Sequence, residues 1–193
     1  MSLAVVILAG GEGRRMGGGK PLRRFGTSTL VAHAAGLARR WSPDVAVAVR
    51  DPAQVAGAVD LPLLVDEPAI GGPAAGLASA FAYARERGAE RLLTLPCDMP
   101  RLPGDLLRRL AEALTPDANV AVAASGGRLH PVCALWRTEA GERLPAYLAS
   151  GRASLRGFAA EVGHVEAAWP DGLDDPFANA NTPDDLAALQ PRG

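Results

Sequence analysis

Residues Leu3–Lys20 read LAVVILAGGEGRRMGGGK, an apolar run that leads directly into a glycine-rich loop. The apolar run Leu3–Ala9 is continuous rather than alternating, which is typical of a strand buried on both faces of a parallel sheet. The loop holds six glycines and ends at Lys20, the only lysine among the 20 basic residues of the chain. Because glycine lets backbone N–H groups approach an anion closely, this junction predicts an α/β fold with a phosphate-binding loop.

The rest of the chain continues the alternation of strands and helices. Further strands are predicted at Val45–Val49, Leu61–Val65, Arg91–Leu95, Val120–Ala124, Pro131–Trp136 and Val165–Trp169. Helices are predicted from the Thr27–Thr29 cap to about residue 40, near 52–59, and over 74–87, 103–114, 138–149, 154–161 and 183–189, the last capped by Thr182. The turn at Gly126–Gly127 makes the strands on either side of it an antiparallel hairpin. One α/β domain spanning 1–193, with a mainly parallel sheet and an antiparallel addition, is the expected architecture.

Composition excludes several classes of protein. The formal net charge of −1 gives no general attraction to nucleic acid or to an anionic membrane, and only 5% of the residues are aromatic. The apolar run near the N-terminus is too short for a signal peptide or a membrane span. We therefore expect a cytoplasmic protein with no nucleic-acid or membrane partner.

Three of the predicted strand ends carry unusual chemistry. Gly10–Lys20 follows the first strand, Asp66 follows the third and Cys97–Asp98 follows the fourth. In an open α/β sheet, ligands bind beyond the carboxyl ends of the strands. Each feature alone has a structural explanation, because glycines make tight turns and aspartates cap helices. Three of them at one edge of the sheet favour a binding site.

Two familiar phosphate-binding motifs are absent from the loop. A Walker A sequence would need glycine at Arg14 and serine or threonine at Pro21. A dinucleotide fingerprint started at Gly11 meets Met16 where its third glycine belongs. The loop must therefore belong to another class of nucleotide site.

The loop LAGGEGRRMGGGK instead resembles the signature of the nucleotidyltransferase superfamily, and specifically of the molybdenum cofactor guanylyltransferase family. The resemblance spans nearly the whole chain, because further landmarks follow in the family's order. They are Asp66, GGPAAGL at 71–77, PCDMP at 96–100, HP at 130–131 and FANANTPDDL at 177–186. It implies a three-layer α/β/α Rossmann-like nucleotidyltransferase fold. It also implies an enzyme that transfers GMP from GTP to the terminal phosphate of molybdopterin, with Mg²⁺ as cofactor, and other molybdenum-cofactor proteins as possible partners.

The same resemblance implies roles for individual residues. The expected nucleotide-binding residues are Leu8, Ala9, Gly10, Gly11, Lys20, Asp66 and Asp98. The expected catalytic residues are Arg15, Lys20 and Asp98: the two cations would counter charge on the leaving pyrophosphate, and Asp98 would hold the metal. The expected pterin-side residues are Asn179 and Asn181, which lie on the same side of an extended segment.

The choice of nucleotide and acceptor stays open at the level of sequence. The related cytidylyltransferase loop is similar to LAAG where this chain has LAGG, and the extra glycine leaves room for a purine, which favours GTP over CTP. The chain could also be a guanylyltransferase for another phosphorylated acceptor, or a non-catalytic nucleotide-binding protein. Asn179 and Asn181 could instead cap the last helix, and His130 is either a loop residue or a ligand. The chain departs from many members of that family at Ala48, where they often have asparagine, and around the loop lysine. Gly19 stands where they have aspartate before it, and Pro21–Leu22–Arg23 where they have a Leu–Leu run after it.

The two cysteines, Cys97 and Cys133, fit no metal-ligand spacing, and two buried thiols are expected rather than a disulfide. Cys97 lies beside Asp98, but no base is near it in the sequence. A nucleophilic role for Cys97 is therefore rejected.

Overall fold

A seven-stranded sheet forms the centre of the protein in a computed structural model that describes residues 2–11, 13–68, 70–170, 172 and 175–191. The strands lie in the order β5-β4-β1-β6-β8-β7-β9. They are β1 Leu3–Leu8, β4 Asp44–Val49, β5 Leu63–Val65, β6 Arg91–Pro96, β7 Val120–Ser125, β8 Arg128–Arg137 and β9 His164–Ala168. Strands β5, β4, β1 and β6 are parallel, β8 runs antiparallel to both of its neighbours, and β9 is parallel to β7. The predicted mainly parallel sheet with an antiparallel addition is confirmed.

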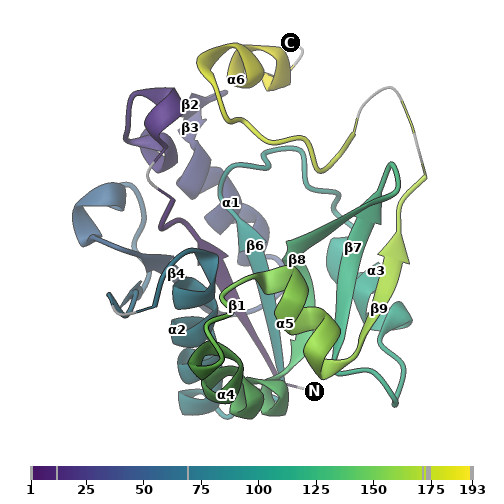
Figure 1. Ribbon diagram of the computed structural model, residues 1–193. Helices are drawn as coiled ribbons and strands as arrows, with labels where there is room; N and C mark the ends of the chain where they lie inside the picture. The colour runs from purple at the N-terminus through teal and green to yellow at the C-terminus, as the bar shows by residue number, and fades with distance from the viewer. Residues whose placement is uncertain (1, 12, 69, 171, 173–174, 192–193) are drawn as a thin grey trace.

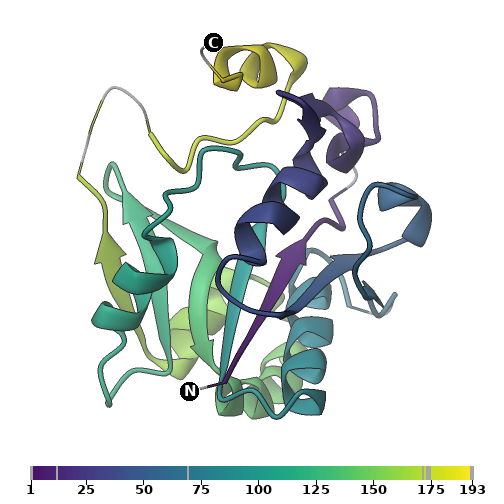
Figure 2. The ribbon, with the colours of Figure 1, turned by 180° about the vertical axis from the view of Figure 1, so that it is seen from behind.

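Helices cover both faces of this sheet, which makes the predicted three layers (Figures 1 and 2). The helices that do so are α1 Leu30–Ala38, α2 Pro73–Glu86, α3 Leu106–Ala113, α4 Leu144–Ala149 and α5 Leu155–Val162, whereas α6 Pro183–Leu189 lies beside the sheet. Helices α2, α4 and α5 pack on one face, whereas α1 and α3 pack on the other. Within the described ranges, the longest helix is α2 with 14 residues, and none has the length and apolar character needed to cross a bilayer.

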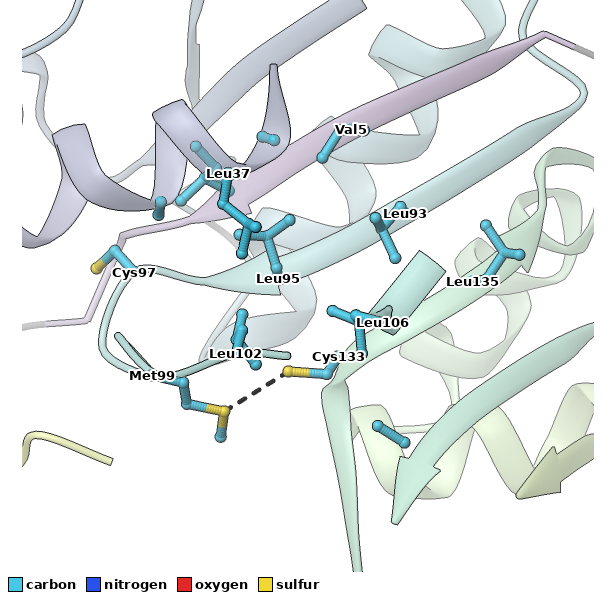
Figure 3. Packing of buried hydrophobic residues seen from close by; sticks show 14 of the residues in the cluster. Val5, Leu37, Leu93, Leu95, Cys97, Met99, Leu102, Leu106, Cys133 and Leu135 are labelled. Atoms are coloured by element: carbon cyan, nitrogen blue, oxygen red, sulfur yellow. Dashed lines mark hydrogen bonds between the residues drawn. The ribbon is translucent and has the colours of Figure 1, made fainter. Parts of the chain in front are cut away.

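Strand β1 shows why a continuous apolar run forms the central strand. Val5 and Ile7 point into the α1/α3 side of the sheet, whereas Ala4 and Val6 point into the α2/α4/α5 side, and all four are fully buried. Figure 3 shows the hydrophobic cluster on the α1/α3 side, in which Val5 lies beside leucines of β6 and α1. Each large apolar side chain buried in this way stabilises the fold by roughly 2 kcal/mol.

The helix boundaries follow from capping and from proline. The hydroxyl of Thr29 accepts a hydrogen bond from Ala32 N, and Thr182 forms a capping box with Asp185, so α1 and α6 begin where the sequence predicts. Pro145 has no N–H group to donate, and the predicted helix at 138–149 divides into a 3₁₀ helix, Thr138–Arg143, and α4. The helix expected near 52–59 is only a 3₁₀ turn, Pro52–Val55.

A further, small hydrophobic core lies beside the sheet, apart from the two clusters on its faces. The strands β2 Arg24–Phe25 and β3 Ser28–Thr29 form a hairpin that the sequence pattern does not predict, and α6 packs next to it (Figure 1). The buried residues of this core are Met16, Phe25, Leu30, Ala180, Leu186 and Leu189. Because Met16 belongs to the glycine-rich loop, this core ties the loop to the C-terminal segment of the chain.

Candidate functional site

A cavity of about 320 Å³ lies at the carboxyl ends of the parallel strands. Its walls include eight of the residues singled out in the sequence: Leu8, Ala9, Gly10, Gly11, Lys20, Asp66, Asp98 and Asn179. Residues separated by more than 160 positions therefore face one space. The structure brings the three predicted strand ends together, as expected for a ligand site in an open α/β sheet, and the roles of these residues in binding remain predictions.

Gly13 lets the glycine-rich loop fold back on itself. Its φ of +58° lies in the left-handed region that favours glycine. A Cβ atom at Gly13 would also lie 2.7 Å from Cβ of Lys20, which leaves no room for a side chain. The loop conformation that presents Lys20 to the cavity therefore depends on glycine at position 13.

Arg23 holds the same loop from outside the cavity. Its Nη2 donates to Met16 O at 2.5 Å and to Gly18 O at 3.2 Å. Sequence reasoning missed this residue as a contributor to the site. The only signal was the departure from the expected Leu–Leu run at Pro21–Leu22–Arg23, and the two hydrogen bonds show what Arg23 does at this position.

Lys20 is the point at which three distant segments meet. Its Nζ lies 2.5 Å from Oδ2 of Asp98, which follows β6, and 2.9 Å from Oδ1 of Asn181, which precedes α6. Only 11% of the Lys20 side chain and 22% of the Asp98 side chain are exposed. An ammonium group offers three donors in a small volume, so one lysine can bind a carboxylate, an amide oxygen and a further acceptor at once.

Asp66 is buried in the cavity wall without full hydrogen bonding. Its side chain is 7% exposed, and Oδ1 has no hydrogen-bond partner among the described residues. Burial raises the pKa of this carboxyl, and the charge of Arg50, another residue of the wall, and the hydroxyl of Ser79 oppose that rise. A buried oxygen without a donor costs folding free energy, so this atom is suited to a donor that a ligand would bring.

Gly10 makes the approach of Asp66 possible. A Cβ at Gly10 would lie 2.5 Å from Oδ2 of Asp66, so the carboxylate occupies the space that a side chain would fill. A Cβ at Gly11 would instead have no atom within 4 Å. The glycine that distinguishes LAGG from LAAG is Gly10, and the space that it leaves is taken by Asp66 rather than open for a base, contrary to the expectation from the sequence. The open space lies at Gly11, which both sequences share.

The donor set at Asp98 suits a hard cation that shares its coordination with a substrate. Among the described residues, no group of three or more histidine, cysteine, aspartate or glutamate side chains could hold a metal by itself. Asp98 and the amide oxygen of Asn181 lie around the same lysine ammonium. Mg²⁺ is usually bound by one or two carboxylates together with phosphate oxygens and water, and this arrangement fits that pattern.

The remaining predicted residues, Arg15 and Asn181, do not line the cavity. Arg15 is exposed and is not part of the cavity wall. A hydrogen bond from Thr182 lowers the pKa of Asp185 in α6, and the charge of Arg15 adds to that effect. Asn181 binds Lys20 and does not cap α6, which has Thr182 as its cap.

The two cysteines are buried thiols, as the sequence predicts. Cys97 and Cys133 are both free and buried. Burial, with a contribution from the charge of Asp98, raises the pKa of the Cys97 thiol to about 12. A thiol with this pKa carries almost no thiolate at neutral pH, which agrees with the rejection of Cys97 as a nucleophile.

Comparison with known proteins places this geometry in a family. The family model described as MobA-like NTP transferase domain matches residues 5–165. The molybdenum cofactor guanylyltransferase of Cereibacter sphaeroides is 43% identical over 195 residues, covering 98% of this chain and 96% of that protein. The protein of the same name from a Bradyrhizobium species is 39% identical over 192 residues, covering 96% and 90%.

Solved structures agree at the level of the fold. The molybdopterin-guanine dinucleotide biosynthesis protein A from Archaeoglobus fulgidus superimposes with a TM-score of 0.75 at 20% identity, covering 96% of this chain and 95% of that one. At this identity the likeness concerns the arrangement of helices and strands. It confirms a Rossmann-like nucleotidyltransferase fold.

Proposed function

The chain belongs to the family of MobA-like NTP transferase domains and is a nucleotidyltransferase, and from this premise we propose that it transfers GMP from GTP to the terminal phosphate of molybdopterin. The observation that carries the proposal is the junction of Lys20 with Asp98 and Asn181. It joins the glycine-rich loop, which suits a triphosphate, to the C-terminal segment, which suits the acceptor.

The phosphate chemistry follows from the charges at this junction. An oxygen of the acceptor's terminal phosphate attacks the α-phosphorus of GTP, a new P–O–P bond forms, and pyrophosphate leaves with the electrons of the broken bond. Such a reaction needs alignment of the reacting groups and neutralisation of charge more than covalent help from the protein. Lys20 counters negative charge on the phosphates, and the same role is proposed for Arg15, which lies in the same loop but outside the cavity wall. Asp98 would hold Mg²⁺, which supplies the remaining positive charge.

Asp66 supports a guanine rather than a cytosine in the cavity. Guanine carries two adjacent donors, N1–H and the N2 amino group, and a carboxylate can accept from both. Cytosine has no such adjacent pair of donors, because its single amino group lies next to an acceptor nitrogen. A base held by Oδ1 of Asp66 would satisfy the oxygen that the protein leaves without a partner.

The acceptor side is assigned to Asn179 and Asn181. Asn179 lines the cavity, and Asn181 binds the same lysine as the metal-binding carboxylate. An asparagine amide has both donors and acceptors, and the pterin ring system presents both along its edge. This assignment puts the pterin phosphate next to the cations that the transfer requires.

The proposal is tested by incubating the protein with molybdopterin, Mg²⁺ and either GTP or CTP, and measuring dinucleotide and pyrophosphate. We expect both products with GTP, and their loss when the divalent cation is removed by a chelator. Turnover of CTP instead of GTP would assign the chain to cytidylyl transfer. GTP binding without turnover would indicate a non-catalytic nucleotide-binding protein.

A further inference from the structure

His130 is a buried histidine that the proposed chemistry does not use. Its side chain is 5% exposed, and it is not part of the cavity wall. Nε2 of its ring lies 2.8 Å from Oγ of Ser125, on the neighbouring strand of the β7–β8 hairpin. His130 therefore belongs to a polar cluster beside the site rather than to the site itself.

Counting protons gives the direction of the hydrogen bonds in this cluster. The Ser125 hydroxyl has one proton and donates it to Oδ1 of Asp175 at 2.9 Å. In its hydrogen bond with the imidazole, Oγ of Ser125 must therefore be the acceptor. The proton of that bond is carried by Nε2 of His130, which donates it. Burial lowers the pKa of His130, which the charge of Asp175 opposes and that of Arg128 reinforces. The neutral ring with a proton on Nε2 then completes a relay from His130 through Ser125 to Asp175.

The same imidazole also holds the residue that follows this contact. Phe177 stacks on His130 with ring centres 4.6 Å apart and an interplanar angle of 13°, and it is 1% exposed. Phe177 N donates to Oδ1 of Asp175 at 2.9 Å, which closes the turn between the two residues. Hydrogen bonds from Ser125 and Phe177 N to Asp175 fix one side of this turn, and stacking on His130 fixes the other.

The turn leads directly into the acceptor-side segment. Figure 1 shows this stretch in yellow, running from beside the β7–β8 hairpin toward α6. Two residues after Phe177, Asn179 lines the cavity, and Ala180 N donates to Asp98 O at 2.8 Å. Asn181 then binds Lys20. The position of both asparagines is therefore set at the start of the segment by Phe177 and at its end by the strand-end site. This name stands for Lys20, Asp66 and Asp98, which surround the cavity at the ends of the strands.

We propose that His130, Ser125 and Asp175 form a latch that positions Asn179 and Asn181 for the acceptor, with His130 as a positioning residue. The proposal rests on the proposed function, because it assigns the segment after Phe177 to the acceptor. Opening the latch loosens the start of this segment, whereas Asp66 and Asp98, which follow β5 and β6, keep their places. The latch thus governs binding of the acceptor and leaves binding of the nucleotide unchanged.

The decisive variant is Ser125→Ala, which removes the middle of the relay. Loss of one positioning partner commonly costs 10- to 100-fold in site function, so we expect KM for molybdopterin to rise about tenfold. KM for GTP should change less than about twofold, because nothing in the latch touches the nucleotide walls. His130→Phe keeps a stacked ring but loses the donor and should behave in the same way. The double variant should be no worse than either single one, because all three break one relay.

Two controls separate positioning from general damage. Asp175→Asn keeps an oxygen that can accept from Ser125 and from Phe177 N, so it should retain most of the affinity for the acceptor. Ser150→Ala removes a hydroxyl that donates to Tyr147 O in α4, away from the site, and should leave both KM values unchanged. A rise in KM for GTP equal to the rise for molybdopterin would overturn the proposal.

Amide hydrogen exchange gives a readout that is independent of turnover. In Ser125→Ala, the amides of residues 177–181 should exchange about tenfold faster, whereas those of β1 and β6 should not change. Unchanged exchange in this segment would overturn the latch. If the wild-type protein does not transfer GMP at all, the proposed function fails, and the exchange data alone decide whether the latch exists.

Discussion

The carboxyl groups of Asp66, which follows β5, and of Asp105, which precedes α3, have opposite environments. Asp105, at the start of α3, accepts from Arg109 Nε at 2.9 Å, from Arg108 Nη2 at 3.1 Å and from Trp169 Nε1 at 3.4 Å. Although burial acts to raise the pKa of Asp105, these hydrogen bonds and charges lower it. Asp66 is more deeply buried, has an oxygen without a partner among the described residues, and has a raised pKa.

The contrast separates a structural carboxylate from one held for a ligand. Asp105 is surrounded by donors from its own helix and from Trp169, so it contributes to stability without any ligand. Asp66 costs stability in the free protein, because burial removes water from the carboxyl and its Oδ1 has no hydrogen-bond partner among the described residues. Proteins keep such local conflicts mainly at functional sites. The Asp105 cluster, which comprises Asp105, Arg108, Arg109 and Trp169, therefore provides matched controls for variants of the strand-end site.

The largest expected effect is on Asp98, the carboxylate that we propose holds the metal. Asp98→Asn should lower kcat about 10³-fold, because the variant loses the charge that holds the cation and pairs with Lys20. Asp105→Asn makes the same chemical change in the Asp105 cluster and should leave kcat within about twofold. Steady-state kinetics with GTP and molybdopterin measure both. Near-wild-type activity of Asp98→Asn would remove the proposed metal site.

A second prediction concerns Lys20. Lys20→Arg should lower kcat about 10²-fold, because a planar guanidinium cannot place its donors on Asp98, Asn181 and a phosphate within the same small volume. The reverse exchange in the Asp105 cluster, Arg108→Lys, should not change kcat, because Arg108 forms exposed pairs with Asp105 and Glu112. Equal rates for Lys20→Arg and the wild-type enzyme would show that only the charge matters at this position.

The sequence predicted those parts of the fold and the site that depend on local pattern. The apolar run of β1 and the glycines after it are sufficient to predict a buried strand and its loop, and parallel strands bring their carboxyl ends together. The hairpin β2–β3 was missed because two residues in each strand show no periodicity. The contact between Ser125 and Asp175 was missed because it joins residues 50 positions apart. Such contacts depend on how the chain returns, which local pattern does not encode.

A third prediction is that replacing Asp66 weakens binding of GTP but stabilises the nucleotide-free protein. Asp66→Asn should raise KM for GTP about tenfold, because the amide cannot accept from both guanine donors. It should also stabilise the nucleotide-free protein at pH 7 by about 1 kcal/mol, because a buried charge is removed. Asp105→Asn should instead destabilise the protein by no more than roughly 1 kcal/mol, since its carboxyl is partly exposed. Urea denaturation measures both free energies, and a loss of stability in Asp66→Asn would break the comparison.

The smallest effect, and the sharpest test of the comparison, is the pH dependence of these stabilities. The raised pKa of Asp66 means that the folded protein binds its proton more tightly than the unfolded chain. Stability from this group is therefore full below its usual pKa of 3.8 and is lost as pH rises through the folded value. The lowered pKa of Asp105 gives the opposite sign: its contribution is present above 3.8 and is lost as pH falls through the folded value.

The two asparagine variants should therefore differ from the wild-type protein in separate pH windows. The stability advantage of Asp66→Asn should grow by about a degree or two in Tm as pH rises from about 4 to 7, whereas the stability deficit of Asp105→Asn should stay nearly constant over that range and shrink below pH 4. Thermal denaturation of the nucleotide-free proteins at several pH values measures both differences. Saturating GTP should remove the advantage of Asp66→Asn, because the ligand then supplies the missing donors to the wild-type carboxylate. An advantage that persists with bound GTP would mean that Asp66 does not contact the nucleotide.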